Sequence, residues 1–349
     1  MYLRLIPLLL VIVPVFAGSF AYREALPGYS YHFPRDHFEH QDFRTEWWYY
    51  TGNVSDAAGK RFGFELVFFR QGERDHQDHD TDNRSAWVVQ DVYLAHAALT
   101  DASGKHFWYG ERLNRAGPAV AGASFGKQRI WNGNWSSQWS GDTQTLDAIT
   151  DKFRFHLTLR PETPPIIQGE NGVSQKAAGK GRASHYVSFP LLRVSGTIGS
   201  DAVTGRAWMD HEWFTEQLAP EQVGWDWFSV QLDDRTELML FELRHKDGTI
   251  DPYSSGTLID SGGKARHLRH DEFVLQPLAK WRKYPVEWRI QVPAWGIDLT
   301  AKAVLGDQEL RDPANKTNYW EGAVDYSGNR HGVGYLEMTG YEQPVRFVK

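Results

Sequence analysis

The sequence predicts an all-β protein built from two related domains, and three observations support this prediction. Strand-like segments recur at short intervals, for example RFGFELVFFR (61–70), WVVQDVYLAHAALT (87–100) and EWRIQVP (287–293). Turn-forming Gly, Asp and Asn residues separate them, and no long amphipathic helical pattern interrupts them. The chain of 349 residues is also long enough for two domains, each with its own hydrophobic core.

An internal similarity indicates where the two domains meet. Residues 47–70 and 225–244 share one pattern, in which an aromatic strand is followed by a polar turn and a hydrophobic strand that ends in Arg. Strand character is lost over residues 214–224. We therefore expect a first domain at 22–217 and a second at 218–349.

The N-terminal residues predict export from the cytoplasm. Arg4 precedes an apolar run from Leu5 to Ala17, which is too short for a permanent bilayer-spanning helix. We interpret residues 1–21 as a signal peptide cleaved after Ala17 or Ala21, with an uncleaved membrane anchor as the alternative. The expected location is the periplasm or the medium. The chain contains no Cys, so neither a disulfide nor a lipoprotein anchor is expected.

Charge and composition exclude one class of partner. The 38 basic and 44 acidic residues give a formal net charge of −6 and are interspersed along the chain, which argues against a nucleic-acid surface. We expect a monomer without a cofactor.

The run TEWWYYTGNV (45–54) predicts a strand that is buried on both faces. Alternation sends Trp48 and Tyr50 to one face and Trp47 and Tyr49 to the other. A sheet closed into a barrel can place one aromatic row in its interior and the other against the neighbouring domain. Barrels of about eight strands can hold one small ligand in the interior.

Two short motifs typical of serine hydrolases lack the expected context. GASFG (122–126) would need a sharp turn from a buried strand into a helix to expose Ser124, and neither flank has a helical pattern. DSGG (260–263) joins two strands as an ordinary turn.

Two polar stretches are expected to be loops. RDHQDHDTDN (74–83) could hold a divalent metal, but Asn83 and Val89 stand where a calcium loop needs Gly and Glu, which favours a solvated loop. We therefore expect no metal site. Residues 161–184, rich in Pro and Gly, are expected to form an exposed loop or flap.

The segment TGRAWMDHEWF (204–214) is the strongest candidate for chemistry. On a strand, Trp208, Asp210 and Glu212 share one face. A carboxylate flanked by indoles in a cavity would lose hydration, so its pKa would rise and it could act as a proton donor. The alternative is an Asp–His pair, formed with His211, that ties a strand end to a loop.

We also expect the two aromatic motifs to meet in space. Two rare clusters of polar and aromatic residues are explained most simply by one shared site, which would bring Glu46 or Trp48 near Asp210 or His211. An unpaired buried charge is costly, so Glu46 should pair with Arg44 or with a donor from the second motif.

These motifs carry a family resemblance. TEWWYYTGN (45–53) and GRAWMDHEW (205–213), with YWEGAVDYSG (319–328) and GVGYLEMTGY (332–341), resemble the AttH-like proteins, long labelled predicted secreted hydrolases. That family is related to the carotenoid 1,2-hydratases and, more remotely, to fungal lipocalin-like pericyclases. The resemblance implies two lipocalin-like antiparallel β-barrels packed together.

The resemblance also implies a chemistry. In the carotenoid hydratases an acidic residue in a Tyr-x-Asp arrangement is thought to protonate an isoprenoid double bond before water adds. That arrangement corresponds to Trp208-Met209-Asp210, so Asp210 carries over and Trp replaces Tyr. The catalytic candidates are therefore Asp210, His211 and Trp208. The ligand-binding candidates are Glu46, Trp47, Trp48, Tyr50, Glu212 and Trp213.

Three functions remain open at this point. The first is an exported protein that binds an apolar isoprenoid or acyl-chain ligand, with acid-assisted hydratase or isomerase chemistry at Asp210. The second is an accessory factor for envelope lipid or lipoprotein transport, with an ABC-type permease as partner. The third is a secreted hydrolase, for which the sequence offers no nucleophile in the required context.

Overall fold

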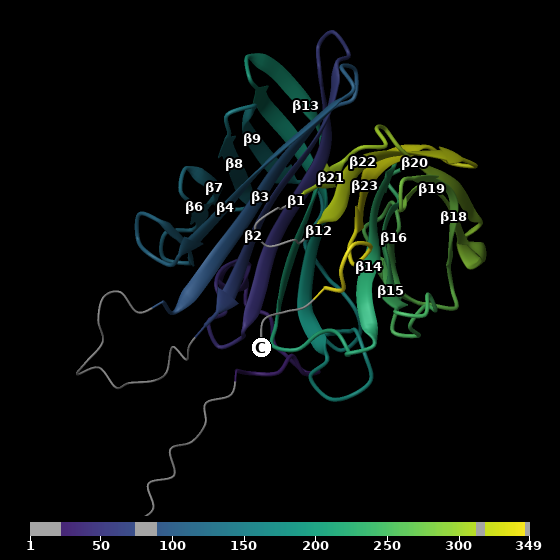
Figure 1. The fold of residues 1–349 in the computed structure, drawn as a ribbon, viewed down its shortest axis with the longest axis horizontal. Helices are drawn as coiled ribbons and strands as arrows, with labels where there is room; N and C mark the ends of the chain where they lie inside the picture. The colour runs from purple at the N-terminus through teal and green to yellow at the C-terminus, as the bar shows by residue number, and fades with distance from the viewer. Residues whose placement is uncertain (1–21, 74–88, 312–317, 346–349) are drawn as a thin grey trace, which may run out of the picture.

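The computed structural model describes residues 22–73, 89–311 and 318–345, which fold into two large curled antiparallel sheets (Figure 1). One sheet curls into a nearly closed barrel and the other into a half-barrel, which confirms the predicted all-β, two-barrel fold class. The predicted metal-binding or solvated loop at 74–83 lies outside the described residues. Within them, no helix is long and apolar enough to cross a membrane.

The N-terminal sheet has the strand order β4-β3-β2-β1-β13-β12-β9-β8-β7-β6-β5, with β10 and β11 paired to β12. A short 3-10 helix, η1 (Arg35–His37), precedes it. The strands are β1 (Thr45–Asp56), β2 (Arg61–Gly72), β3 (Asp91–Asp101), β4 (His106–Arg115), β5 (Ala121–Ser124), β6 (Arg129–Asn132), β7 (Trp135–Ser140), β8 (Thr143–Ile149), β9 (Arg154–Pro161), β10 (Ile166–Ile167), β11 (Ser174–Gln175), β12 (Ala183–Ile198) and β13 (Asp201–Phe214).

Hydrogen bonds between distant strands show how strongly the N-terminal sheet curls. The side-chain amide of Asn132 on β6 donates to the Tyr93 carbonyl on β3 at 3.0 Å and to the Arg112 carbonyl on β4 at 3.2 Å. Strands from opposite ends of the sheet therefore lie side by side. The inward row includes Trp48, Tyr50 and other buried apolar side chains.

The C-terminal sheet has the strand order β17-β16-β15-β14-β23-β22-β20-β19-β18, with β21 paired to β22. A short 3-10 helix, η3 (Pro293–Trp295), connects two of its strands. The strands are β14 (Gln222–Leu232), β15 (Glu237–His245), β16 (Ser255–Ile259), β17 (Ala265–Arg269), β18 (Val274–Trp281), β19 (Tyr284–Val292), β20 (Ile297–Ala303), β21 (Glu309–Leu310), β22 (Tyr319–Gly328) and β23 (Gly332–Met338).

The two sheets pack face to face through a shared layer of side chains, here called the inter-sheet interface. Its apolar members include Tyr49, Trp208, Trp227 and Tyr335. The side chain of Asn53 crosses it and donates to the Gly334 carbonyl at 3.0 Å. Both faces of β1 are therefore buried, as its aromatic run predicts.

The segment 161–184 differs from the expected exposed flap. It contains β10 and β11, both paired with β12, and it supplies the buried side chains of Gln168 and Lys176. Its Pro and Gly content suits the turns, while its polar side chains find partners in the interior. The segment therefore covers β12 rather than extending into solvent.

Candidate functional site

Pairing of β1 with β13 brings the two aromatic motifs together. Trp48 lies opposite His211 and Tyr49 opposite Asp210, although about 160 residues separate the two strands in the sequence. The expected contact between the motifs is confirmed. Because side chains alternate along each strand, the pair carries one group of residues inside the N-terminal sheet and another in the inter-sheet interface.

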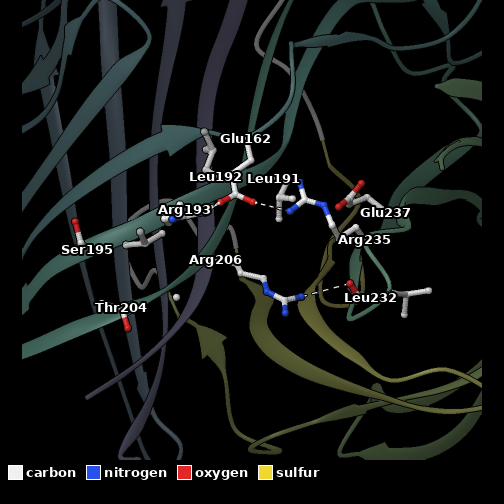
Figure 2. A pocket seen from close by; sticks show the side chains of 12 residues that line it. Glu162, Leu191, Leu192, Arg193, Ser195, Thr204, Arg206, Leu232, Arg235 and Glu237 are labelled. Carbon is white, nitrogen blue, oxygen red and sulfur yellow. Dashed lines mark hydrogen bonds and ion pairs between the residues drawn. The ribbon is translucent and has the colours of Figure 1, made fainter. Parts of the chain in front are cut away.

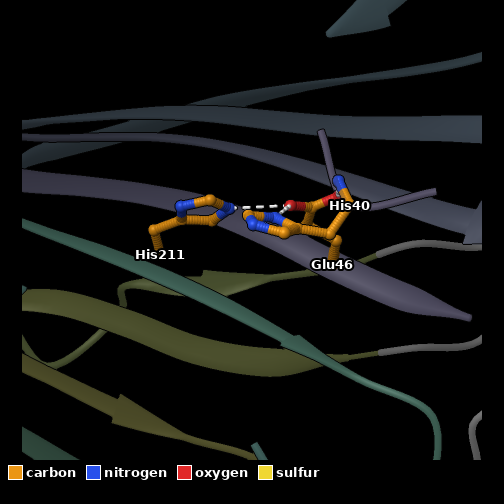
Figure 3. A group of neighbouring side chains, drawn as sticks. All are labelled: His40, Glu46 and His211. Atoms are coloured by element: carbon orange, nitrogen blue, oxygen red, sulfur yellow. Dashed lines mark hydrogen bonds and ion pairs between the residues drawn. The ribbon is translucent and has the colours of Figure 1, made fainter. Parts of the chain in front are cut away.

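The inner group is centred on Glu46, which is fully buried (Figure 3). Its Oε1 accepts hydrogen bonds from His40 Nδ1 at 2.7 Å and His211 Nε2 at 2.8 Å. Its Oε2 accepts from Arg70 Nε at 3.1 Å and from the His40 amide at 2.9 Å. Four donors therefore surround this carboxylate.

Arg70 links this carboxylate to the N-terminal segment. Its guanidinium pairs with Asp91 at 3.0 Å and donates to the carbonyls of His40 and Phe43 at 2.8 and 2.6 Å. Burial opposes ionisation of Glu46, but the charges and hydrogen bonds of His40, His211 and Arg70 hold its pKa well below the ordinary value. This buried group is therefore a charged network.

The expected partners of Glu46 are found in part. His211 is the predicted donor from the second motif, whereas Arg44 is not a partner. The reason is register, since Arg70 lies directly opposite Glu46 on β2. The Arg44 guanidinium instead lies 5.8 Å from the centre of the Tyr22 ring.

The inner group also contains a set of metal-ligand atoms. One atom each from His40, Glu46 and His211 lies within 4.8 Å of the others. However, Glu46 already accepts four hydrogen bonds, and the Arg70 cation contacts the same carboxylate. Among the described residues, these contacts account for the cluster as a hydrogen-bond network that anchors the N-terminal segment.

The second group is centred on Asp210, which is 3% exposed and faces the inter-sheet interface. The Tyr186 hydroxyl donates to its Oδ2 at 2.6 Å, while Ser188 and the Trp208 indole donate to its Oδ1. These three partners are neutral. Burial raises the pKa of Asp210 to about 7, and the three hydrogen bonds oppose only part of that rise.

Other elements position the partners of Asp210. The Trp227 indole on β14 donates to the Tyr186 hydroxyl at 3.1 Å, and Gln168 donates to Ser188 at 2.9 Å. Thr257 on β16 donates in turn to Gln168. The carboxyl group of Asp210 is therefore held by both sheets and by the segment that covers β12.

Glu212 lies two residues further along the same face. It accepts hydrogen bonds from Ser184 and from Gln217, the latter at 3.1 Å, and lies 3.8 Å from the Lys176 ammonium. Burial raises the pKa of Glu212, while Lys176 opposes that rise. The Lys176 ammonium also lies 3.9 Å from the centre of the Phe241 ring.

A surface groove of about 440 Å³ runs along β12 and β13 (Figure 2). Arg193 and Arg235 both pair with Glu162 at its rim. The buried Gln231 side chain bridges the carbonyls of Pro190 and Ala207, at 2.7 and 2.9 Å. The other residues lining the groove include Leu191, Leu192, Val194, Arg206 and Leu232.

The structure divides the predicted site residues between the two faces. Glu46, Trp48, Tyr50 and His211 belong to the inner face. Trp213 continues that face of β13 but packs in a separate buried cluster with Phe43, and it stacks on His40 with ring centres 3.8 Å apart. Trp47, Trp208, Asp210 and Glu212 face the inter-sheet interface. Trp48 and Asp210 therefore do not line one cavity, because they lie on opposite faces of adjacent strands.

Four partners were missed by reasoning from the sequence: His40, Arg70, Tyr186 and Ser188. Arg70 ends a hydrophobic strand, and Tyr186 and Ser188 share one face of a long strand by alternation. Those patterns mark them as strand residues, but the sequence carries no signal for which strand lies beside them.

The comparisons with known proteins agree on the fold. A family model described as AttH-like matches residues 24–341. The crystal structure of a protein assigned to AttH from Nitrosomonas europaea matches with a TM-score of 0.81 and 34% identity, covering 91% of this chain and 99% of that chain. Kievitone hydratase from Nectria haematococca matches with a TM-score of 0.64 and 14% identity, covering 86% and 90%. No match was found among curated proteins.

Proposed function

The chain belongs to the AttH-like family, and from that premise we propose that it binds an apolar isoprenoid or acyl-chain ligand at the inter-sheet interface and protonates it with Asp210. The observation that carries the proposal is the buried hydrogen-bonded pair of Asp210 and Tyr186. The chain shares its overall fold with kievitone hydratase, so hydratase-type chemistry is compatible with this architecture.

The protonation state of Asp210 suits an acid that gives and later recovers a proton. A carboxyl group with a pKa of about 7 is partly protonated at neutral pH. In the proposed step, the proton of Asp210 forms a C–H bond with the π electrons of an alkene and leaves a cation on the neighbouring carbon. Water then forms the C–O bond, and its surplus proton returns to Asp210.

The aromatic rings around Asp210 favour a developing cation. Trp208 and Trp227 lie edge to face with ring centres 6.1 Å apart, next to the carboxyl group. Indole faces attract cations and exclude water at the same time. An isomerase would use the same cation and lose a proton from the adjacent carbon.

Tyr186 supplies a hydroxyl group that the linear motif lacks. The resemblance to the carotenoid hydratases places a Tyr two residues before the acid, where this chain has Trp208. Tyr186 comes from the neighbouring strand β12, yet its hydroxyl lies 2.6 Å from Asp210. It can accept the proton of neutral Asp210 in a hydrogen bond while it directs its own proton toward a ligand or water.

Buried charge favours a neutral ligand over a fatty-acid anion. Asp210, Glu212 and Glu337 face the inter-sheet interface, and the Lys176 ammonium interacts with the first two. A ligand carboxylate would add a like charge among groups that already resist ionisation. A neutral isoprenoid alcohol or alkene avoids that cost.

The groove along β12 and β13 is the proposed entry for such a ligand. Its lining combines leucine side chains with arginines at the rim, and it follows the strands that carry Asp210 and Tyr186. The Gln231 amide crosses from β14 to the Pro190 carbonyl on β12 and the Ala207 carbonyl on β13, next in sequence to Leu191 of the groove and to Trp208.

The experiment compares binding with turnover, using geranylgeraniol as the probe. Binding is followed by quenching of Trp fluorescence, and hydration by mass spectrometry of the recovered probe. Asp210→Asn keeps the shape of the side chain but removes its acidic proton, so we expect unchanged binding and loss of the hydrated product. Asp147→Asn, at an exposed pair with His156, is the matched control.

Equal product formation by wild type and Asp210→Asn would exclude the acid role. No quenching by geranylgeraniol or by a fatty acid would exclude the binding function. Quenching by the fatty acid alone would contradict the preference for a neutral ligand.

We further propose export and, as a second candidate function, an accessory role in envelope lipid or lipoprotein transport. The supporting observation is the signal-like sequence at residues 1–21. Fractionation of cells that produce the full chain tests export. The accessory role would be favoured if the protein co-purified with an ABC-type permease and hydrated no lipid. Failure to co-purify with a permease would count against this role.

A further inference from the structure

A second buried acid in the inter-sheet interface is connected to the surface by a chain of hydrogen bonds. Glu65 on β2 is fully buried, and the Tyr319 hydroxyl donates to its Oε1 at 3.1 Å. Tyr319 OH lies 2.7 Å from His96 Nδ1. His96 Nε2 lies 3.2 Å from Glu111 Oε2, and 28% of the Glu111 side chain is exposed.

We propose that Glu111, His96 and Tyr319 form a proton relay that exchanges protons between solvent and Glu65. Each internal member can both accept and donate, because imidazole has two ring nitrogens and phenol has one oxygen that serves both purposes. The links are within hydrogen-bond distance from one end to the other. This relay uses none of the residues of the proposed Asp210 site.

The transfer balances over three proton movements. With Glu111 protonated and Glu65 ionised, the Glu111 proton moves to His96 Nε2, the Nδ1 proton moves to the Tyr319 oxygen, and the Tyr319 proton moves to Glu65 Oε1. The result is ionised Glu111, neutral His96 and Tyr319, and protonated Glu65. The reverse sequence returns the proton to the surface.

The inner end of the relay lies among groups that favour a protonated Glu65. Glu321 on β22 and Glu337 on β23 face the same interface and repel its charge, and Tyr49 donates to Glu321. Burial is the main cause that raises the pKa of Glu65. Glu65 therefore favours its acid form, while the exposed Glu111 has solvent as a proton source and acceptor.

Two oxygen atoms at the inner end of the relay indicate that these buried acids have a function beyond stabilising the fold. Glu65 Oε2 and Glu321 Oε2 are buried and have no hydrogen-bond partner among the described residues. Native proteins seldom leave buried carboxyl oxygens unpaired, because the cost of desolvation is then not recovered. A protonated Glu65 at this position can donate to a ligand or water between the sheets.

The relay predicts an effect on the rate of proton exchange at Glu65, which can be measured separately from any change in its pKa. The exchange of the Glu65 proton for deuterium is followed by rapid mixing into D2O with infrared detection of the carboxylic-acid band. The Glu65 band is identified by its loss in Glu65→Gln. Tyr319→Phe and Glu111→Gln each interrupt the relay, and we expect exchange to slow by at least about tenfold in both.

Matched variants separate this effect from a change in packing. Tyr326→Phe removes another buried tyrosine hydroxyl from β22, one that donates to the Ser229 carbonyl at 2.8 Å and lies outside the relay. It should leave the exchange rate unchanged. Glu111 is on the surface, so Glu111→Gln tests the relay even if Tyr319→Phe folds poorly.

Two results would overturn the proposal. One is wild-type exchange rates in Tyr319→Phe and Glu111→Gln. The other is the absence, in wild type, of an acid band that Glu65→Gln removes. Loss of geranylgeraniol hydration in Asp210→Asn would not affect either result, so the two proposals fail or succeed separately.

Discussion

Two carboxylates on the same pair of strands illustrate how neighbours, rather than burial alone, set the state of a charged group. Glu46 on β1 and Asp210 on β13 are both buried. Glu46 has two imidazoles and a guanidinium around it and a lowered pKa, whereas Asp210 has only neutral donors and a pKa raised to about 7. Desolvation acts on both, and only Glu46 is in direct contact with a cation that offsets it.

The comparison assigns different roles to the two faces. The inner network fixes the segment before β1 to the sheet, because Arg70 also binds the carbonyls of His40 and Phe43. The Asp210 group holds a carboxyl that can exist with or without its proton. One face therefore contributes mainly to stability, and the other is suited to chemistry.

The largest expected effect follows from removing the cation of the inner network. Arg70→Ala leaves Glu46 and Asp91 buried without their guanidinium partner, so we expect a loss of about 3–5 kcal/mol in the free energy of unfolding. Urea denaturation measures this loss. Arg193→Ala, at a pair with Glu162 in which the Arg193 side chain is 75% exposed, should change stability by about 1 kcal/mol or less. Equal effects of the two variants would contradict the comparison.

Replacement of each acid by its neutral amide should also destabilise the protein more at Glu46 than at Asp210. Glu46→Gln removes the charge that Arg70 and His40 require, so we expect a loss of about 2–4 kcal/mol. Asp210→Asn replaces a group with neutral partners, and a loss of about 1 kcal/mol or less is expected. Denaturation of both variants at neutral pH provides the measurement. A larger loss for Asp210→Asn would show that its carboxylate is the structural one.

The pH dependence of stability should have opposite signs for the two acids. Glu46 has a lowered pKa, so its contribution is present above the ordinary glutamate pKa and is lost as pH falls through the folded value. Asp210 has a raised pKa, so its contribution is present below the ordinary value of 3.8 and is lost as pH rises to about 7.

The measurement is the unfolding free energy of wild type minus that of each neutral variant, between about pH 3 and pH 8. The difference should rise with pH for Glu46→Gln and fall with pH for Asp210→Asn, by about 1.4 kcal/mol for each pH unit in this range that lies between the ordinary and the folded pKa of the acid. Curves of the same sign would contradict the assignment of one charged and one protonated acid.

The smallest expected effect concerns the hydroxyl groups that hold Asp210. Tyr186→Phe removes a donor that stabilises the ionised form, so the pKa of Asp210 should rise further. We expect a change of about 1 kcal/mol or less in stability and a shift of the high-pH limb of any turnover profile to still higher pH, because Asp210 must be protonated to act as the acid. Ser188→Ala should act in the same direction. A shift to lower pH would indicate that these hydroxyls favour the neutral acid.

Much of the fold could be predicted because strand periodicity is local. Alternation in TEWWYYTGNV put Trp48 and Tyr50 on one face and Trp47 and Tyr49 on the other, and the structure shows that the first pair points inward and the second faces the interface. The same rule separates Asp210 from His211 on β13. The contact between the two motifs could also be predicted, because one shared site is the simplest explanation for two rare polar and aromatic clusters.

The sequence by itself determined which residues form strands and which side chains share a face, because both depend on a two-residue repeat. Only the tertiary structure decided that Arg70 lies opposite Glu46 and that Tyr186 and Ser188 reach Asp210. Those contacts depend on which strands become neighbours and in what register. The packing of the second sheet also decided that Asp210 is buried rather than exposed, and its raised pKa follows from that burial.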